Sequence, residues 1–151
     1  LIKNSSRLKK EVCLPSPTSG RQGSSAEVAV SISFFIPKPH TYWEREGMVD
    51  VALLEKRQNL LKSKIAQSKK IKLKFHNLNL SYLEAILSRG DRRLSSLIES
   101  AFKAGARLDS WYEYFQFSLW QEAFKKCGIE AEFYLRARSP HEILPWQFIG
   151  I

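Results

Sequence analysis

Two short stretches of the sequence place charged or titratable side chains on restricted backbone. In Pro37-Lys38-Pro39-His40, two prolines spaced by one residue favour an extended path, so Lys38 and His40 should be held in fixed positions. The second stretch, Ser88-Arg89-Gly90-Asp91-Arg92-Arg93, packs opposite charges into a short corner between two expected helices. Such a corner could hold an anion. Its charges could equally pair with one another and only orient the helices.

Other catalytic and metal sites have no signature in the sequence. It contains no nucleophile motif of the G-x-S-x-G type and no glycine-rich phosphate loop. The three histidines are far apart, and Cys13 and Cys127 have no metal-ligand spacing and form no disulfide framework. We therefore expect no metal site in this chain, and the cysteine usage favours a reducing cytoplasm.

The composition is that of a folded protein. The chain has 151 residues, of which 44% are hydrophobic and 12% aromatic, enough for one domain with a buried core. No apolar run approaches the roughly 20 residues of a membrane span, and no apolar segment follows the first basic residues, so we expect neither a membrane helix nor a signal peptide.

The positive charge is concentrated in one part of the chain. The net charge is +9, and a stretch without any acidic residue holds eight basic side chains: Lys56, Arg57, Lys62, Lys64, Lys69, Lys70, Lys72 and Lys74. Clustered cations are what RNA phosphates require, so this block predicts either an RNA-binding surface or the solvated face of a helix and a strand.

The pattern of the first half predicts a strand, a helix and a second strand. Residues 1–26 are rich in proline, glycine and serine and read as a poorly ordered lead-in. Alternating large and small side chains predict a strand over residues 27–36 with both faces covered. Asp50 should cap a helix running to about residue 68, and residues 70–75 alternate lysine with apolar side chains as a short strand.

The second half predicts helices. Ser81 and Glu84 form a capping box at the start of one, Gly90 should end it in the left-handed region, and Asp91 should cap the next, which ends at Gly105. A further helix should start near Ser118 and close at Gly128, followed by a short one over residues 133–136. The aromatic stretch 111–120 could stack bases, but such density is more typical of a core.

Several motifs resemble those of a known enzyme family. The stretch Ser31-Ile32-Ser33-Phe34-Phe35-Ile36-Pro37-Lys38-Pro39-His40-Thr41 looks like the last barrel strand and exit loop of radical S-adenosylmethionine proteins. Four later motifs occur in the order seen in the uncharacterised subgroup with an N-terminal cobalamin-binding domain: Lys72-Leu73-Lys74-Phe75-His76, Ser88-Arg89-Gly90-Asp91-Arg92-Arg93-Leu94, Gly105-Ala106-Arg107-Leu108-Asp109-Ser110-Trp111 and Leu144-Pro145-Trp146. The resemblance covers residues 28–146.

The resemblance implies an α/β fold, or α+β for the isolated piece. Residues 27–69 would be the last strand and helix of a radical S-adenosylmethionine barrel, and residues 70–151 a mainly helical C-terminal extension. Because chemistry in such barrels sits at the carboxyl ends of strands, Lys38 and His40 become candidates for binding cofactor or substrate. The corner residues Arg89, Asp91 and Arg92 would contact substrate or pin the extension.

Two departures from the family limit what this chain can do. The run Tyr42-Trp43-Glu44-Arg45 replaces the family's usual Pro-Phe-Gln-Trp, and the three-cysteine motif that binds the 4Fe-4S cluster is absent. The chain also begins at Leu1, so we expect a piece of a longer protein, inactive alone, whose N-terminal domains are its partners. The parent protein would hold the cluster, S-adenosylmethionine and, in this subgroup, cobalamin. The alternative is a basic module that binds RNA or docks onto other domains without catalysis.

Overall fold

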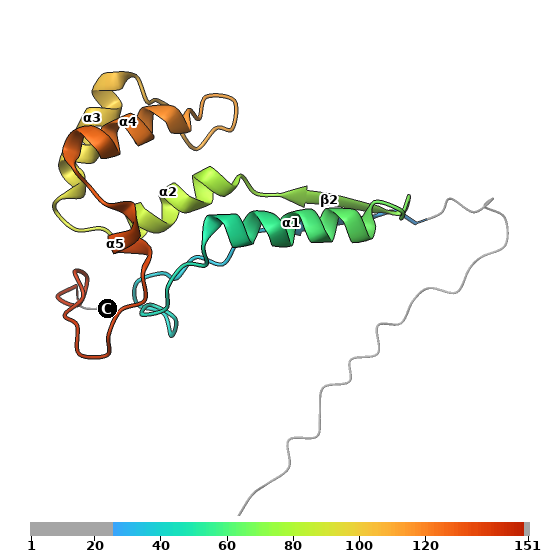
Figure 1. The fold of residues 1–151 in the computed structure, drawn as a ribbon, viewed down its shortest axis with the longest axis horizontal. Coiled ribbons are helices and arrows are strands. Elements are labelled where there is room, and N and C mark those ends of the chain that lie inside the picture. Colours follow the sequence, from blue (N-terminus) through green and yellow to red (C-terminus); the bar gives the residue numbers. More distant parts are fainter. Residues whose placement is uncertain (1–25, 150–151) are drawn as a thin grey trace, which may run out of the picture.

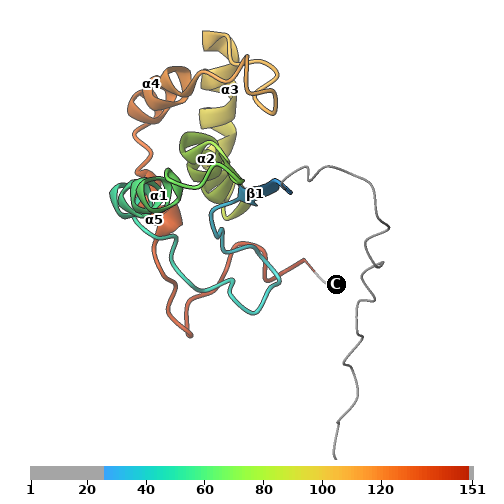
Figure 2. The same ribbon diagram turned by 90° about the vertical axis from the view of Figure 1, so that its right-hand side faces the viewer.

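The computed structural model describes residues 26–149, and residues 1–25, the expected lead-in, lie outside this range. Within it the fold is a small mixed α/β arrangement that contains no barrel: β1 (Val28–Ile32), α1 (Val51–Ile65), β2 (Ile71–Phe75), α2 (Leu78–Ser88), α3 (Leu94–Ala104), α4 (Phe117–Cys127) and α5 (Ala131–Leu135). Figure 1 shows an elongated molecule, with α1 and the strands at one end and α3 and α4 at the other. Figure 2 views it from the end with α1 and the strands, and α3 and α4 lie above α1 in that view.

The first unit is a β–α–β crossover. Strands β1 and β2 pair in parallel, with Val28 beside Ile71 and Ile32 beside Phe75. Strand β1 is shorter than predicted, because its partner ends at Phe75; the N–H of His76 makes the last contact, donating to the Ile32 carbonyl at 3.0 Å. The sheet joins segments on both sides of the boundary that we expected at residue 69.

The two faces of this sheet differ in character. Because side chains alternate along a strand, one face carries the large apolar residues Val28, Val30, Ile32, Ile71, Leu73 and Phe75. Helix α1 lies along the sheet, and the Lys62 ammonium of α1 lies 5.4 Å from the centre of the Phe75 ring (Figure 1). The opposite face carries small and cationic side chains, all exposed: Ala29, Ser31, Lys72 and Lys74.

Helix α1 begins as predicted and α2 does not. The Asp50 carboxylate accepts a hydrogen bond from the Leu53 N–H at 3.2 Å, which is the expected N-cap. Helix α2 starts one turn before the predicted capping box, because the Asn77 side chain already caps it by accepting from Asn79 and Leu80. Ser81 is consequently buried inside the helix.

Helices α3 and α4 pack against each other and end as predicted, at Gly105 (φ 110°) and Gly128 (φ 61°), both in the left-handed region. Gly90, by contrast, does not have the expected positive φ. A Cβ at this position would lie 2.2 Å from Leu94 Cδ1, so the corner needs glycine for close packing rather than for its backbone conformation.

The core lies between α2, α3, α4 and α5. It is built from Leu83, Ile86, Leu94, Leu97, Ala101, Ala106, Trp120, Ala123, Ala131 and Tyr134. The aromatic stretch contributes only in part: Trp120 is buried, whereas Trp111 and Tyr112 are 60% and 71% exposed. The interpretation of this stretch as core is therefore correct for its last residue and wrong for these two loop residues.

Candidate functional site

The two groups of candidate residues predicted from the sequence come from segments that touch each other. Lys38 and His40 lie in the loop after β1, and Arg89, Asp91 and Arg92 lie where α2 meets α3. The Lys38 ammonium reaches the Glu84 carboxylate on α2 at 2.5 Å, and Arg89 donates to the Glu46 carbonyl of the same loop at 2.6 Å. The fold thus brings the β1 exit loop against α2 at two points.

Arg89 is the largest fully buried side chain of the described residues. Its Nη1 donates to the Glu46 carbonyl at 2.6 Å and its Nη2 to the Arg136 carbonyl at 3.0 Å, while Nε has no partner there. Burial lowers the pKa of Arg89, and the charges of Arg138 and Arg136 lower it further. The guanidinium therefore lies in the interior, where its two terminal nitrogens donate to main-chain carbonyls. It is not available to bind a ligand.

The charges of the corner pair with one another. Asp91 accepts from the Arg93 main-chain N–H at 2.9 Å and from Arg93 Nη2 at 2.6 Å, and the Tyr134 hydroxyl donates to Asp91 at 3.3 Å. The hydrogen bonds from Arg93 hold the pKa of Asp91 below its ordinary value. Arg92 is exposed. The geometry is that of a salt-bridged corner.

The exit loop after β1 is ordered by local hydrogen bonds. Pro37 is buried, and the Thr41 hydroxyl donates to the Lys38 carbonyl at 2.7 Å. His40 has a positive φ of 58°, which its main-chain N–H stabilises by donating to the Glu44 carboxylate at 3.0 Å. The His40 residue is exposed. The loop therefore turns at His40 instead of following the extended path that the two prolines predicted, and Lys38 and His40 lie at the surface of this turn.

A clasp between residues 41–49 and residues 135–146 was not foreseen from the sequence. The main chain of Met48 donates to Leu135 at 2.8 Å, and that of Arg138 donates to Arg45 at 2.7 Å. Gly47 permits this approach, because a Cβ there would lie 2.9 Å from the Ala137 nitrogen. The indole of Trp146 also donates to the Glu44 carboxylate at 2.9 Å and lowers the Glu44 pKa.

Beside the clasp, the Glu142 carboxylate forms ion pairs with two arginines. Glu142 accepts from Arg136 at 2.8 Å and 2.9 Å and from the buried Arg138 at 2.9 Å. These bonds, with Arg136 as the larger cause, lower the pKa of Glu142 to about 2. With Arg89 nearby, this region holds more positive than negative charge, which makes the Glu142 carboxylate essential to it.

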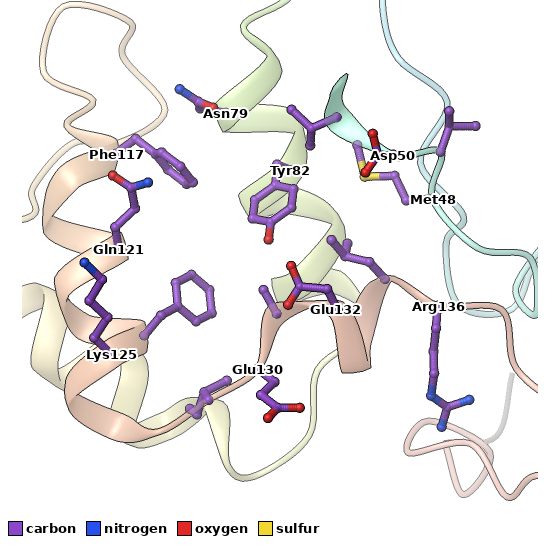
Figure 3. A pocket seen from close by; sticks show the side chains of 16 residues that line it. Met48, Asp50, Asn79, Tyr82, Phe117, Gln121, Lys125, Glu130, Glu132 and Arg136 are labelled. Carbon is purple, nitrogen blue, oxygen red and sulfur yellow. The ribbon is translucent and has the colours of Figure 1, made fainter. Parts of the chain in front are cut away.

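A groove of about 860 Å³ opens on another side of α5. Its lining comes from the start of α1, from α2, α4 and α5, and from the segment before α1 (Figure 3): Met48, Val49, Asp50, Val51, Asn79, Tyr82, Phe117, Gln121, Phe124, Lys125, Ile129, Glu130, Ala131, Glu132, Leu135 and Arg136. None of the five site residues predicted from the sequence lines it. No sequence motif marks the groove, because its walls come from segments far apart in the chain.

Tyr82 and Glu132 face each other inside this groove (Figure 3). Burial raises the pKa of Tyr82 to about 12, and the Glu132 carboxylate beside it acts in the same direction. The phenol therefore stays protonated at neutral pH and can donate a hydrogen bond. The Tyr82 ring meets the Phe117 ring edge to face, with 5.9 Å between their centres.

Over residues 26–149, no three His, Cys, Asp or Glu side chains are grouped so as to hold a metal ion. No helix in the same part of the chain is long and apolar enough to cross a membrane. Neither a protein-family model, nor a curated protein, nor a solved structure matches the chain.

Proposed function

We propose that this chain is the C-terminal section of a radical S-adenosylmethionine enzyme of the subgroup that carries an N-terminal cobalamin-binding domain. The ordered set of motifs between residues 28 and 146 supports the proposal from the sequence. The observation that carries it furthest is the parallel β1–α1–β2 crossover, which is the unit from which parallel barrels are built.

The polarity of the sheet fits the inside and outside of a barrel. In such barrels helices cover the outer face, which here corresponds to the apolar side of β1 and β2, with α1 alongside. The other face of β1, with Ala29 and Ser31, would line the interior, where small side chains leave room for a ligand. Within residues 26–149 each strand has one neighbour only, so both edges offer hydrogen bonds to further strands of a parent protein.

The candidate residues then take different roles. Lys38 and His40 follow the carboxyl end of β1, where barrel enzymes bind substrate and cofactor, and they would contact an anionic group there. Arg89 and the Asp91–Arg93 pair would fix the helical extension to the barrel, because Arg89 bonds the exit loop and the C-terminal segment together. Arg92 remains a candidate for substrate contact.

The chain itself does not fit the iron–sulfur cluster. A radical S-adenosylmethionine cluster needs three thiolates, and the sequence has two cysteines, one of which, Cys127, lies at the end of α4. No catalytic step is therefore assigned to these 151 residues. The cluster, S-adenosylmethionine and cobalamin would bind to the parent protein.

The reading frame upstream of Leu1 tests the proposal. We expect it to continue and to encode a three-cysteine motif, preceded by a cobalamin-binding domain. A reading frame without such a motif would refute the assignment to this family. The alternative, a module that binds RNA or docks without catalysis, would then stand, and the exposed lysines of β2 are the observation that favours it.

A further inference from the structure

The groove between α2, α4 and α5 has walls of two kinds. Half-buried aromatic rings of Tyr82, Phe117 and Phe124 form one part of the lining, and the Tyr82 and Phe117 rings stand almost at right angles, with an interplanar angle of 88°. Two rings in this arrangement offer a corner in which a compact group can touch both. Apolar side chains of Met48, Val49, Val51, Ile129 and Leu135 complete the lining.

The charges of the groove are predominantly negative, although the chain carries a net charge of +9. Asp50, Glu130 and Glu132 line it, and none of them forms an ion pair within residues 26–149. Of the two cations in the lining, Arg136 already pairs with Glu142 at 2.8 Å. Only Lys125 remains to offset the three carboxylates.

Glu132 is the carboxylate best placed to act on a ligand. It lies opposite the Tyr82 hydroxyl inside the groove (Figure 3), on the first turn of α5. Glu132 forms no ion pair within residues 26–149, and a carboxylate has about four lone-pair sites with which to accept hydrogen bonds from a ligand. A positive charge next to Glu132 would also lie near the Tyr82 hydroxyl, within the aromatic part of the groove.

We infer that this groove binds an organic cation, an alkylammonium group on an apolar body. The aromatic rings attract a cation through their negative faces, the Glu132 carboxylate compensates its charge, and the apolar lining covers the carbon skeleton. The volume of about 860 Å³ is in the range of small-molecule sites. This inference does not depend on the proposed function, because it rests on the groove lining and needs neither a complete barrel nor a cluster.

The test compares choline with 3,3-dimethylbutan-1-ol, which has the same shape but no charge. Binding to the full 151-residue chain is followed by NMR through the side-chain signals of Tyr82 and Phe117. We expect choline to shift these signals and to bind at least about tenfold more tightly than the neutral alcohol. Equal binding of the two probes, or binding of neither, would overturn the inference.

Three variants locate the site. Glu132→Gln removes the charge that we assign to binding and should weaken choline binding about tenfold, whereas Lys125→Gln removes the opposing charge and should strengthen it. Glu122→Gln is the matched control, because Glu122 is exposed on α4 and does not line the groove. If Glu132→Gln and Glu122→Gln bind choline equally well, the assignment to this groove is wrong.

Discussion

Arg89 donates to the main-chain carbonyl of Glu46 at 2.6 Å across 43 residues of sequence, and its other terminal nitrogen reaches the Arg136 carbonyl at 3.0 Å. One buried guanidinium thereby joins the exit loop of β1, the end of α2 and the C-terminal segment. This side chain, the clasp around Gly47 and the Lys38–Glu84 ion pair link the helices to the loop after β1.

Replacing Arg89 with alanine should strongly destabilise the protein. The change removes the donors of two main-chain carbonyls and leaves a cavity in place of a fully buried side chain, so we expect the free energy of unfolding to fall by about 3–5 kcal/mol. Arg92→Ala, at an exposed position of the same corner, should change it by less than about 0.5 kcal/mol. Urea unfolding midpoints measure both. Similar losses for the two variants would show that Arg89 does not hold the segments together.

Gly90→Ala should destabilise the protein, because the added Cβ clashes with the Leu94 side chain. The added Cβ would lie 2.2 Å from Leu94 Cδ1, and overpacking of this kind costs about 1–3 kcal/mol. In the Leu94→Ala background the same glycine change should cost much less, because the opposing methyl group is gone. A double-mutant cycle with purely additive effects would contradict the packing explanation.

Some helix ends were predictable because they depend on local chemistry, although the predicted Asp91 cap of α3 is wrong: Arg93 is the N-cap, without a side-chain hydrogen bond. The Asp50 cap and the left-handed glycines at 105 and 128 are signals within one turn of the helix end. In the sequence, Gly90 resembles these two glycines, but it lacks their positive φ, and its function is to make room for the Leu94 side chain. Helix α2 does not start at Ser81 as predicted, because the Asn77 side chain caps it one turn earlier.

The arrangement of the site could be predicted only in part. Of the two alternatives for the corner charges, an anion site or pairing with one another, the structure shows a pair between Asp91 and Arg93. The burial of Arg89 depends on carbonyls 43 and 47 residues away, and the groove depends on α2, α4 and α5 meeting. Contacts at such separations leave no periodic pattern in the sequence.

Glu142 should make the stability of the fold sensitive to acid. Its pKa is about 2 in the folded protein against an ordinary value of 4.5, so the folded state favours the ionised form. This stabilisation is complete above pH 4.5 and is lost as the pH falls toward 2. Unfolding free energies measured across this range should decline, and Glu142→Gln should flatten the decline. An unchanged slope would mean that other carboxyl groups cause it.

The lysines of β2 test the RNA alternative. Lys72 forms an exposed ion pair with Glu27 at 2.5 Å, and Lys72 and Lys74 lie on the exposed face of the sheet. Replacing Lys70, Lys72 and Lys74 together with alanine should leave folding intact, because Ile71, Leu73 and Phe75 carry the apolar contacts of the strand, and exposed pairs contribute at most about 1 kcal/mol.

We also expect RNA binding to be weak in the wild-type chain and unchanged in this triple variant. Filter binding at several salt concentrations provides the measurement, since phosphate contacts release counterions and give a steep salt dependence. Micromolar binding by the wild-type chain in physiological salt, lost in the variant, would instead establish the lysine face as an RNA site.

Iron analysis of two anaerobically reconstituted proteins tests the proposed family most directly. One is the 151-residue chain and the other is the product of the reading frame extended upstream of Leu1. We expect the extended protein to bind about four irons and, when supplied with a one-electron reductant such as dithionite, to cleave S-adenosylmethionine to 5′-deoxyadenosine. The shorter chain should bind no cluster, because two cysteines cannot replace a three-cysteine motif. An extended protein without a cluster, or a stoichiometric cluster on the short chain that requires Cys127, would contradict the assignment.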